Sequence, residues 1–398
     1  MCTTPPRLVT LVLLTALTVL TLNMFLPALP AMRVFFGVDE AVMGRAISVY
    51  MAAAALLQLI LGPLSDRLGR RPVILGLLVV YVAASVLCLL AQDITTFLIA
   101  RTAQAVAVGG GILASAAVRD MYEGRTAAAK LSLIAAAMAI APMIAPMAGG
   151  LLEAAAGWRA VFVTYALLGA GLLIWCWWDL GETHAHGKGQ RLELGALLRA
   201  RVFWAYAGVQ AFGVGVFYVF LTGAPFVAAD AFGLGPALTG VALGSTTAGF
   251  MAGATLSARL MQRVGPTRLI LIGRLVPIAG LGAALVYYGS GGGSVWPLFL
   301  STITVGIGNG LSLPGANAGA LSVRPDLAGS ASGLGGAVSL GLGALLTAAA
   351  TRVIAASTTA DALLVLMVGI SALALVCALL ARRWDGGAQA AKDGVSNA

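Results

Sequence analysis

Three polar side chains lie inside long apolar stretches of the chain, where side chains able to do chemistry are scarce. Asn23 lies within the stretch 8–31, and Arg101 and Gln104 lie near the start of the stretch 97–118. An ionisable side chain one turn into an apolar helix is costly and marks a functional site by default. Arg101 can hold an anionic or polar group of a small molecule or influence a proton site, whereas Asn23 cannot titrate. We therefore take Asn23, Arg101 and Gln104 as candidate functional residues.

Each candidate also has a structural alternative. Arg101 can extend to the membrane interface, as long basic side chains do, and Asn23 can hydrogen-bond between helices. Other polar or aromatic side chains within apolar stretches can line a cavity, although helix packing explains each of them equally well. The candidates added on this ground are Tyr50, Phe217, Tyr218 and Asn309.

The apolar stretches that hold these residues dominate the composition. Of 398 residues, 60% are hydrophobic and 10% are charged, against about 45–50% and about 25% in soluble domains. A bilayer-spanning helix needs about 20 mainly apolar residues, so the chain has room for twelve spans and for no large aqueous domain. We predict spans at residues 8–31, 42–64, 72–91, 97–118, 129–152, 158–178, 202–224, 237–258, 268–289, 296–320, 330–354 and 361–381.

The basic residues predict how these spans are oriented, because cytoplasmic loops carry an excess of Lys and Arg. With both termini in the cytoplasm, 18 of the 24 basic residues lie on that side, and Arg101 and Arg274 lie within or near spans. The net charge of +9 is thus a topology signal, since it is clustered between apolar stretches, and we expect no nucleic-acid partner. The basic residues left outside are Arg33, Arg45, Arg159 and Arg352.

The longest polar stretch, residues 179–201, divides the chain into two halves. We predict a six-helix bundle at 1–178, a cytoplasmic central loop at 179–201, a second six-helix bundle at 202–381 and a cytoplasmic tail at 382–398. The sequence LSDRLGRRPVIL at 64–75 is echoed by LMQRVGPTRLIL at 260–271. Parallel repeats of six spans around a midplane site are a recurrent transporter plan.

The loop between spans two and three, GPLSDRLGRRP at 62–72, combines an acid, three arginines and two glycines. Asp66 at a helix end can pair with cationic groups or with a helix N-terminus, and such a lock can form and break during transport. We expect Gly62 to let span two approach a neighbour closely and Gly69 to permit a tight turn. The alternative, that Arg67, Arg70 and Arg71 only anchor the cytoplasmic side, leaves Asp66 and the glycines unexplained.

This loop resembles the major facilitator superfamily, whose loop here has the pattern G-x-L-a-D-r-x-G-r-[RK]. The R-x-x-Q of Arg101 to Gln104 is similar to the start of span four in the superfamily's drug exporters. The sequence APMIAPMAGG at 141–150 is similar to the antiporter pattern g-x-x-x-G-P-x-x-G-G, with Ala145 in place of a Gly. The sequence TLNMFLPALP at 21–30 resembles the Bcr/CflA drug-resistance branch, as does R-D-x-y-x-G from Arg119 to Gly124, except that Asn23 replaces an Asp of that branch.

The resemblance implies an all-α major facilitator fold with twelve transmembrane helices in two six-helix bundles, and efflux of small amphiphilic compounds or antibiotics by alternating access. It implies that Asn23, Arg101 and Gln104 contact a substrate. It also implies a cavity-facing Arg101 and proton antiport, although Asn23 leaves the proton-carrying group unassigned. Pro142 and Pro146 remove backbone donors and bend span five, and Gly149 and Gly150 allow tight packing. The expected gating residues are Gly62, Asp66, Arg67, Gly69, Arg70, Arg71, Arg119, Asp120, Pro142, Pro146, Gly149 and Gly150.

Other classes of protein fit the sequence less well. No phosphate-binding G-x-x-x-x-G-K-[ST] loop and no H-E-x-x-H pair occur, so we expect neither an enzyme, a metal nor a cofactor, and the proton gradient should drive transport. Import or exchange of a small metabolite on the same fold stays open, as does a non-transporting membrane sensor. We expect a monomer in a bacterial-type inner membrane, with the lipid bilayer and a small-molecule substrate as its partners.

Overall fold

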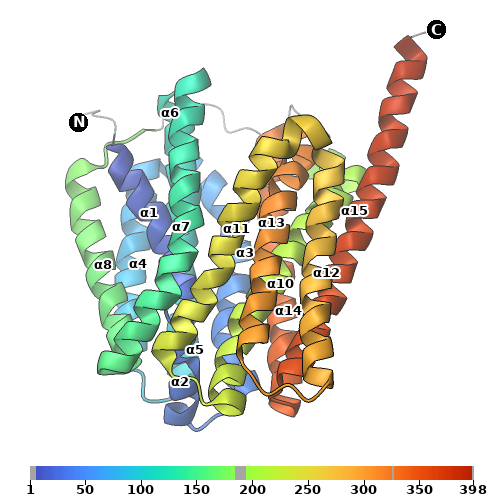
Figure 1. The fold of residues 1–398 in the computed structure, drawn as a ribbon. Coiled ribbons are helices and arrows are strands. Elements are labelled where there is room, and N and C mark those ends of the chain that lie inside the picture. Colours follow the sequence, from blue (N-terminus) through green and yellow to red (C-terminus); the bar gives the residue numbers. More distant parts are fainter. Residues whose placement is uncertain (1–5, 184–193, 325–326, 397–398) are drawn as a thin grey trace. The chain divides into compact units, whose positions relative to one another are not determined.

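A computed structural model describes residues 6–183, 194–324 and 327–396, and these residues form helices and no strand (Figure 1). The first half contains α1 (Leu8–Asn23), η1 (Leu26–Ala28), α2 (Leu29–Phe36), α3 (Glu40–Leu68), α4 (Arg70–Leu90), α5 (Ile94–Ala103), η2 (Gln104–Ala107), α6 (Val108–Met121), α7 (Gly124–Ala156) and α8 (Arg159–Asp179). The second half contains α9 (Leu194–Arg199), α10 (Arg201–Phe232), α11 (Pro236–Val264), α12 (Pro266–Gly289), α13 (Trp296–Ser322), α14 (Ala328–Ala356) and α15 (Ala360–Ser396). The predicted all-helical transmembrane fold is confirmed.

Ten helical stretches in the described part of the chain are long and apolar enough to cross a membrane. Two further long helices, α11 and α13, correspond to predicted spans eight and ten and are diluted by Gly, Ser, Thr and Asn. These small residues have a packing role. A Cβ built at Gly249 or Gly253 of α11 would meet the carbonyl oxygens of Ile303 or Ile307 on α13. Such small-xxx-small spacing lets helix backbones approach closely within a membrane.

The approach is reciprocal. A Cβ at Gly306 or Gly310 of α13 would meet the carbonyl oxygens of Thr246 or Phe250 on α11. Helix α13 also packs along α12. The glycines of α11 and α13 therefore allow the backbones of the two helices to pack directly against each other.

Spans one and four are both interrupted where the candidate polar residues lie. Helix α1 ends at Asn23 and the chain continues through η1 into α2, because Pro27 and Pro30 lack the N–H that an unbroken helix needs. In span four, the 3₁₀ segment η2 begins at Gln104, between α5 and α6. Short 3₁₀ segments inside a helix often mark functional hinges.

The chain forms two compact units that do not follow chain order. Unit 1 comprises Met1–Gln190, Leu221–Gly244 and Thr347–Thr358, and unit 2 comprises Arg191–Phe220, Ser245–Leu346 and Thr359–Ala398. Helices α10, α11 and α14 are each divided between the units. Residues 184–193 of the predicted central loop lie outside the described residues, and α15 continues from the last predicted span through the predicted tail to Ser396.

Candidate functional site

Arg101 forms the centre of a buried polar cluster in unit 1. It is fully buried, two turns into a helix that begins at Ile94, so its predicted position one turn into the span is wrong, as is the alternative of extension to the interface. Its Nη1 donates to Gln104 Oε1 at 2.7 Å and its Nη2 donates to the carbonyl oxygen of Thr21 at 2.8 Å. Its Cζ lies 4.0 Å from the ring centroid of Phe25 and 4.5 Å from that of Tyr50.

Hydrogen bonds extend this cluster across four spans. Gln104 Nε2 donates to Ser85 Oγ on α4 at 2.8 Å. The hydroxyl groups of Thr21 and Tyr81 lie 2.9 Å apart, and the Tyr165 hydroxyl donates to the Thr21 carbonyl oxygen at 3.1 Å. The polar group formed by Thr21, Asn23, Tyr50, Tyr81, Ser85, Arg101, Gln104 and Tyr165 is called the Arg101 cluster below.

Three atoms of the Arg101 cluster are buried without a hydrogen-bond partner among the described residues. They are Asn23 Oδ1, the Tyr50 hydroxyl and Arg101 Nε. The other end of the Asn23 amide donates to the Val19 carbonyl oxygen within its own helix at 2.8 Å. Buried polar groups normally have partners, and each exception needs an explanation. Arg101 Nε can donate to a ligand as part of a cation, Asn23 Oδ1 can accept, and the Tyr50 hydroxyl can do either. This set suits a polar group of a small molecule.

Asn309 belongs to a second buried polar group, in unit 2, with Arg274 at its centre. Arg274 is 3% exposed, and its Nη2 donates to Asn309 Oδ1 at 2.9 Å, to the carbonyl oxygen of Gly308 at 3.2 Å and to Ser312 Oγ. Asn309 Nδ2 donates to the carbonyl oxygen of Gly213 on α10 at 3.0 Å. The sequence signal for Arg274 was a lone basic residue in an apolar stretch, but it did not reveal these partners.

The remaining predicted substrate contacts, Phe217 and Tyr218, lie half-buried on α10 in unit 2. Their ring centroids are 5.6 Å apart. The predicted substrate residues therefore separate into Asn23, Tyr50, Arg101 and Gln104 in the Arg101 cluster, and Phe217, Tyr218 and Asn309 in unit 2.

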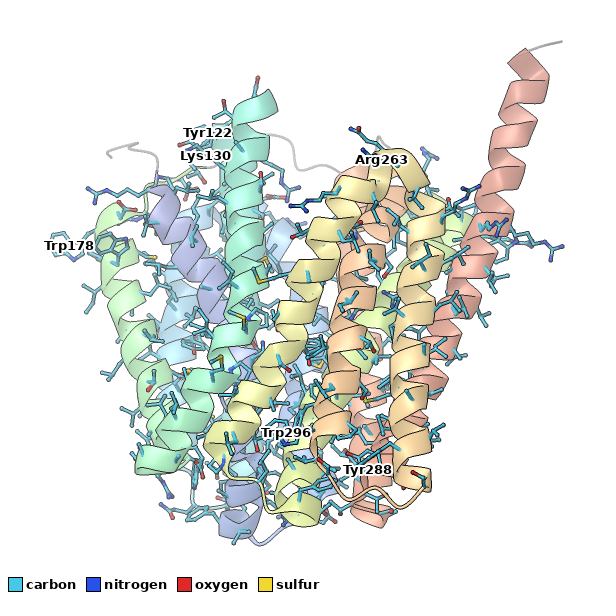
Figure 2. The ribbon with its side chains drawn as sticks, viewed as in Figure 1. Tyr122, Lys130, Trp178, Arg263, Tyr288 and Trp296 are labelled. Atoms are coloured by element: carbon cyan, nitrogen blue, oxygen red, sulfur yellow. The ribbon has the colours of Figure 1, made fainter. Side chains whose placement is uncertain are left out.

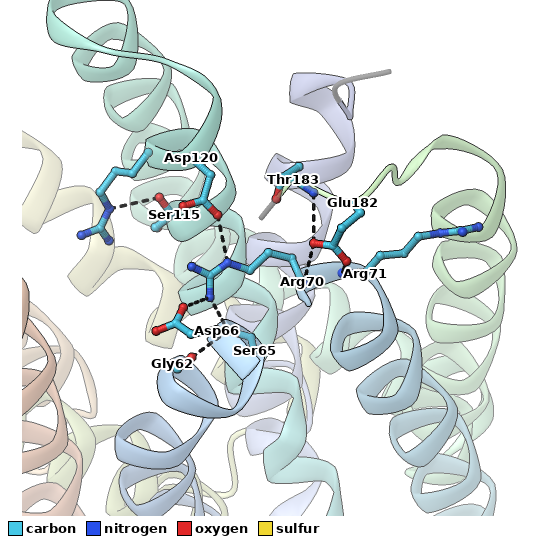
Figure 3. Close-up of polar contacts among 10 residues, drawn as sticks. Gly62, Ser65, Asp66, Arg70, Arg71, Ser115, Asp120, Glu182 and Thr183 are labelled. Carbon is cyan, nitrogen blue, oxygen red and sulfur yellow. Dashed lines mark hydrogen bonds and ion pairs between the residues drawn. The ribbon is translucent and has the colours of Figure 1, made fainter. Parts of the chain in front are cut away.

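The loop between α3 and α4 forms an ion-pair network centred on buried Arg70 (Figure 3). Arg70 Nη1 lies 2.6 Å from Asp66 Oδ1, and Arg70 Nε donates to Asp120 Oδ2 at 3.0 Å. Nη1 also donates to Ser65 Oγ. Charge-assisted bonds of this kind are stronger than neutral ones. The expected pairing of Asp66 with a cation is present, and its partner is an arginine of the same loop.

Glu182 completes this network from the segment that follows α8, and the sequence prediction missed it. Its carboxylate accepts from the backbone N–H of Arg70 at 2.8 Å and of Arg71 at 3.2 Å (Figure 3). These are the first free N–H groups of α4, where a carboxylate also interacts favourably with the helix dipole. Gly69 has φ +94°, and a Cβ there would meet Glu182 Oε2 at 2.5 Å. The absence of a side chain at Gly69 thus permits both the positive φ of the turn and the close approach of the Glu182 carboxylate.

Three predicted gating residues near this loop take no part in the ion pairs of Arg70. Arg67 is exposed, and Arg119 Nε donates to the carbonyl oxygen of Ser115 in its own helix at 3.2 Å. A Cβ built at Gly62 would meet nothing within 4 Å. The close helix approach expected at Gly62 is therefore wrong, because α3 is not crowded at this point.

The expected tight packing of α7 is present. A Cβ at Gly149 would meet the carbonyl oxygen of Met24, and a Cβ at Gly150 would meet that of Pro236 on α11. In return, a Cβ at Gly240 would meet the carbonyl oxygen of Pro146. Pro142 and Pro146 both lie inside α7. This contact brings the start of α11 against α7 within unit 1.

An ion pair at the predicted outer end also joins segments distant in sequence. Arg33 of α2 donates to Asp230 of α10 through Nη1 at 2.7 Å and through Nη2 at 3.0 Å, and its Nη1 also contacts Glu40 of α3. The sequence predicted that Arg33 lies outside, but it did not predict a partner for this residue. Since all three residues belong to unit 1, the ion pair is part of that unit's packing.

Comparisons with known proteins agree with this architecture. A family model described as Major Facilitator Superfamily matches residues 11–348. The chain is 28% identical over 341 residues to the uncharacterized MFS-type transporter YdgK of Bacillus subtilis (strain 168), covering 82% of this chain and 84% of that one. It is 29% identical over 320 residues to multidrug resistance protein MdtL of Escherichia coli O139:H28, covering 79% and 81%.

A solved structure has the same fold. A bacterial homolog of the human lysosomal transporter Spinster, in an inward-facing and occupied conformation, matches with a TM-score of 0.79 over 94% of this chain and 95% of that one. The two sequences are 18% identical, so the likeness concerns the fold alone.

Proposed function

Because the chain belongs to the Major Facilitator Superfamily and is a multi-pass membrane transporter, we propose that it exports small amphiphilic compounds, antibiotics among them, by alternating access. The multidrug resistance protein MdtL, 29% identical over most of both chains, supports this direction of transport. The protein would reside in a bacterial inner membrane as a monomer with both termini in the cytoplasm, and it would use no cofactor.

The Arg101 cluster is the observation on which the proposal rests. Gln104 and the Thr21 carbonyl hold a fully buried guanidinium. The Tyr50 hydroxyl and Asn23 Oδ1 of the same cluster are buried without a described partner. Burial of such polar and charged groups within a membrane protein has a high free-energy cost. Ligand binding explains why this free-energy cost is tolerated, because a polar group of the substrate supplies the missing hydrogen-bond partners. The 3₁₀ break at Gln104 gives the span a point at which to adjust when the substrate enters.

Proton antiport is the proposed driving force, and Glu153 is the carboxyl best suited to carry the proton. The span-one position that holds an acid in the resembling branch is Asn23 here. Among the described acids, Glu153 in the last turn of α7 has a buried carboxylate oxygen, Oε2, without a hydrogen-bond partner. A carboxyl that is neither ion-paired nor fully solvated can gain and lose a proton during a transport cycle.

Efflux from cells that lack their own exporters tests the proposal. Cells expressing the intact protein should accumulate less of a panel of antibiotics and dyes than cells expressing Arg101→Ala, and a protonophore should abolish the difference. Arg45→Ala, which removes an exposed arginine, is the matched control and should behave as the intact protein. The Glu153→Gln variant should still bind the compounds, but their accumulation in cells that express it should not change when the protonophore is added.

Three results would contradict the proposal in different ways. Unchanged accumulation for every compound would exclude export, and raised accumulation would favour import on the same fold. Efflux that persists with the protonophore would leave export intact and exclude the proton as the driving ion.

A further inference from the structure

Among the described residues, the spans contain buried positive charge without matching negative charge. Arg101 and Arg274 are 0% and 3% exposed, and the Nε of each is buried without a hydrogen-bond partner. The acids whose side chains are described all lie in loops or within a turn or so of a helix end: Asp39, Glu40, Asp66, Asp93, Asp120, Glu123, Glu153, Asp179, Glu182, Asp230 and Asp361. No described carboxylate therefore pairs with either buried guanidinium.

The groups that do contact the two guanidiniums are neutral. Arg101 has an amide, a carbonyl and two aromatic rings around it. Arg274 has the carbonyl oxygen of Gly308, the amide of Asn309 and the hydroxyl of Ser312. Dipoles and rings hold a cation in place, but they leave its charge uncompensated, and an uncompensated buried charge is strongly unfavourable.

We propose that the compounds bound by this transporter carry an anionic group, such as a carboxylate, sulfonate or phosphate, because each unit holds a buried guanidinium without a described carboxylate partner, Arg101 in unit 1 and Arg274 in unit 2. This inference rests on the proposed export function and narrows its substrate class. A cationic amphiphile would add like charge to an interior that already has an excess of it. Arg274 becomes a specificity-determining residue, in addition to its packing role between α12 and α13.

A pair of dyes that share a xanthene ring tests the charge preference. Fluorescein is anionic at pH 7 and rhodamine 123 is cationic, and fluorescence anisotropy measures the binding of each to the purified full-length protein. Fluorescein should bind at least about tenfold more tightly. Arg101→Gln and Arg274→Gln should each weaken fluorescein binding by about tenfold without weakening rhodamine 123. Arg101→Lys and Arg274→Lys should retain most of the preference, and Arg45→Gln all of it.

Loss of packing alone would not change the ratio of the fluorescein affinity to the rhodamine 123 affinity. Thermal melting shows whether each variant is folded. The inference is overturned if rhodamine 123 binds as tightly as fluorescein, if neither dye binds, or if the folded glutamine variants keep the ratio. Export of an uncharged or cationic compound without fluorescein binding would leave the proposed function standing and refute the charge preference. Fluorescein binding without export of any compound would support the charge preference and refute the proposed export function.

A separate observation concerns the surface between α4 and α8. A groove of about 290 Å³ is lined by Leu75, Val79, Leu173, Ile174, Trp177 and Trp178. Trp178 is 84% exposed and projects away from α8 (Figure 2). Tryptophan in such a position is typical of the boundary between lipid tails and headgroups.

Arg71 lies at the loop end of this groove, one turn before Leu75 and two turns before Val79 on the same face of α4. Its Nη2 donates to the carbonyl oxygen of Trp177 at 3.0 Å, and its Cζ lies 5.9 Å from the Trp177 ring centroid. Figure 3 shows this side chain leading away from the Arg70 network. The Nε of Arg71 is buried without a hydrogen-bond partner among the described residues, and Glu182 accepts from the backbone N–H of Arg71.

We infer that the groove binds one anionic phospholipid, with an acyl chain along Leu75 and Val79 and the phosphate at Arg71. An apolar groove that ends at an arginine matches a lipid that is apolar at one end and negative at the other. This site is independent of the substrate and of the direction of transport.

Native mass spectrometry of the full-length protein, after incubation with dioleoylphosphatidylglycerol or dioleoylphosphatidylcholine, tests the lipid site. Phosphatidylglycerol should be retained several-fold more than phosphatidylcholine. Arg71→Gln should remove the preference and Arg71→Lys should keep it, while Val79→Trp, which fills the groove, should reduce retention of both lipids. Equal retention of the two lipids by the intact protein, or an unchanged preference in Arg71→Gln, would overturn the inference.

Discussion

The guanidinium of Arg33 meets the carboxylate of Asp230 in a bidentate arrangement, with nitrogen–oxygen distances of 2.7 and 3.0 Å. These residues are 197 positions apart in sequence, and they join α2 to the last turn of α10. Bidentate geometry makes this pair one of the stronger contacts between the two segments, although both side chains keep partial solvent contact.

We expect Arg33→Gln and Asp230→Asn each to lower the thermal stability of the purified protein. The coupling between the two substitutions should be about 0.2–1 kcal/mol, as for partly exposed ion pairs. A double-mutant cycle measured by thermal or denaturant melting gives this coupling. Glu40→Gln is the necessary control, because Glu40 also contacts Arg33. Strict additivity of the two substitutions would show that the pair contributes nothing.

Gly149→Ala should be strongly destabilising. The added methyl group would be driven into the backbone carbonyl of Met24, and backbone cannot move aside as a flexible side chain can. The matched control is Gly171→Ala in α8, where a Cβ would meet nothing within 4 Å. That substitution should be neutral or stabilise the helix by about 1 kcal/mol. Melting temperatures of the two variants in detergent give the comparison, and equal values would contradict the close contact.

Glu182→Ala should loosen the start of α4. The N–H groups of Arg70 and Arg71 would lose their acceptor, at a cost of about 1 kcal/mol, which is typical for removal of a helix cap. Hydrogen exchange at these two amides should speed up while exchange in the middle of α4 stays unchanged. Glu182→Gln keeps a side-chain oxygen and should have a smaller effect. Unchanged exchange in Glu182→Ala would show that solvent replaces the carboxylate without loss.

Gln104→Glu should give Arg101 a carboxylate partner in place of its amide. The Oε1 that accepts from Arg101 Nη1 at 2.7 Å would then carry negative charge. We expect fluorescein binding to fall about tenfold, since the variant would supply internally the charge that an anionic ligand brings. Gln104→Met, which has similar length and no charge, separates the effect of charge from the loss of the hydrogen bond to Ser85. Equal fluorescein affinity in the intact protein and in the folded Gln104→Glu variant would contradict a role for the Arg101 charge.

The sequence predicted the helices well because each apolar stretch carries its own length and boundaries. Pro27, Pro30 and Gly69 also lie at the breaks and turns that their chemistry dictates. A lone arginine within an apolar stretch is visible without a structure, so Arg101 was found. The orientation of the spans and the extents of the two bundles stay predictions.

The partners of these residues were less predictable, because they depend on which helices meet. Tyr81, Ser85 and Tyr165 are ordinary residues of membrane helices until packing places them around Arg101. Glu182 is one acid in a polar stretch, and only the approach of α8 to the start of α4 makes it a cap. Nearness in sequence misled in one case, since Gly62 has the same motif context as Gly69 but no crowded neighbour.

The interlocked glycines of α11 and α13 limit how the transporter can deform. Gly249 and Gly253 lie closest to the backbone of α13 while Gly306 and Gly310 lie closest to the backbone of α11, and backbone cannot change rotamer when the two helices slide past each other. Helices α11 and α13 should therefore move together as one rigid pair in the membrane. Within unit 1, by contrast, the 3₁₀ segments beside Asn23 and Arg101 are points where the backbone departs from a regular helix and can deform during transport.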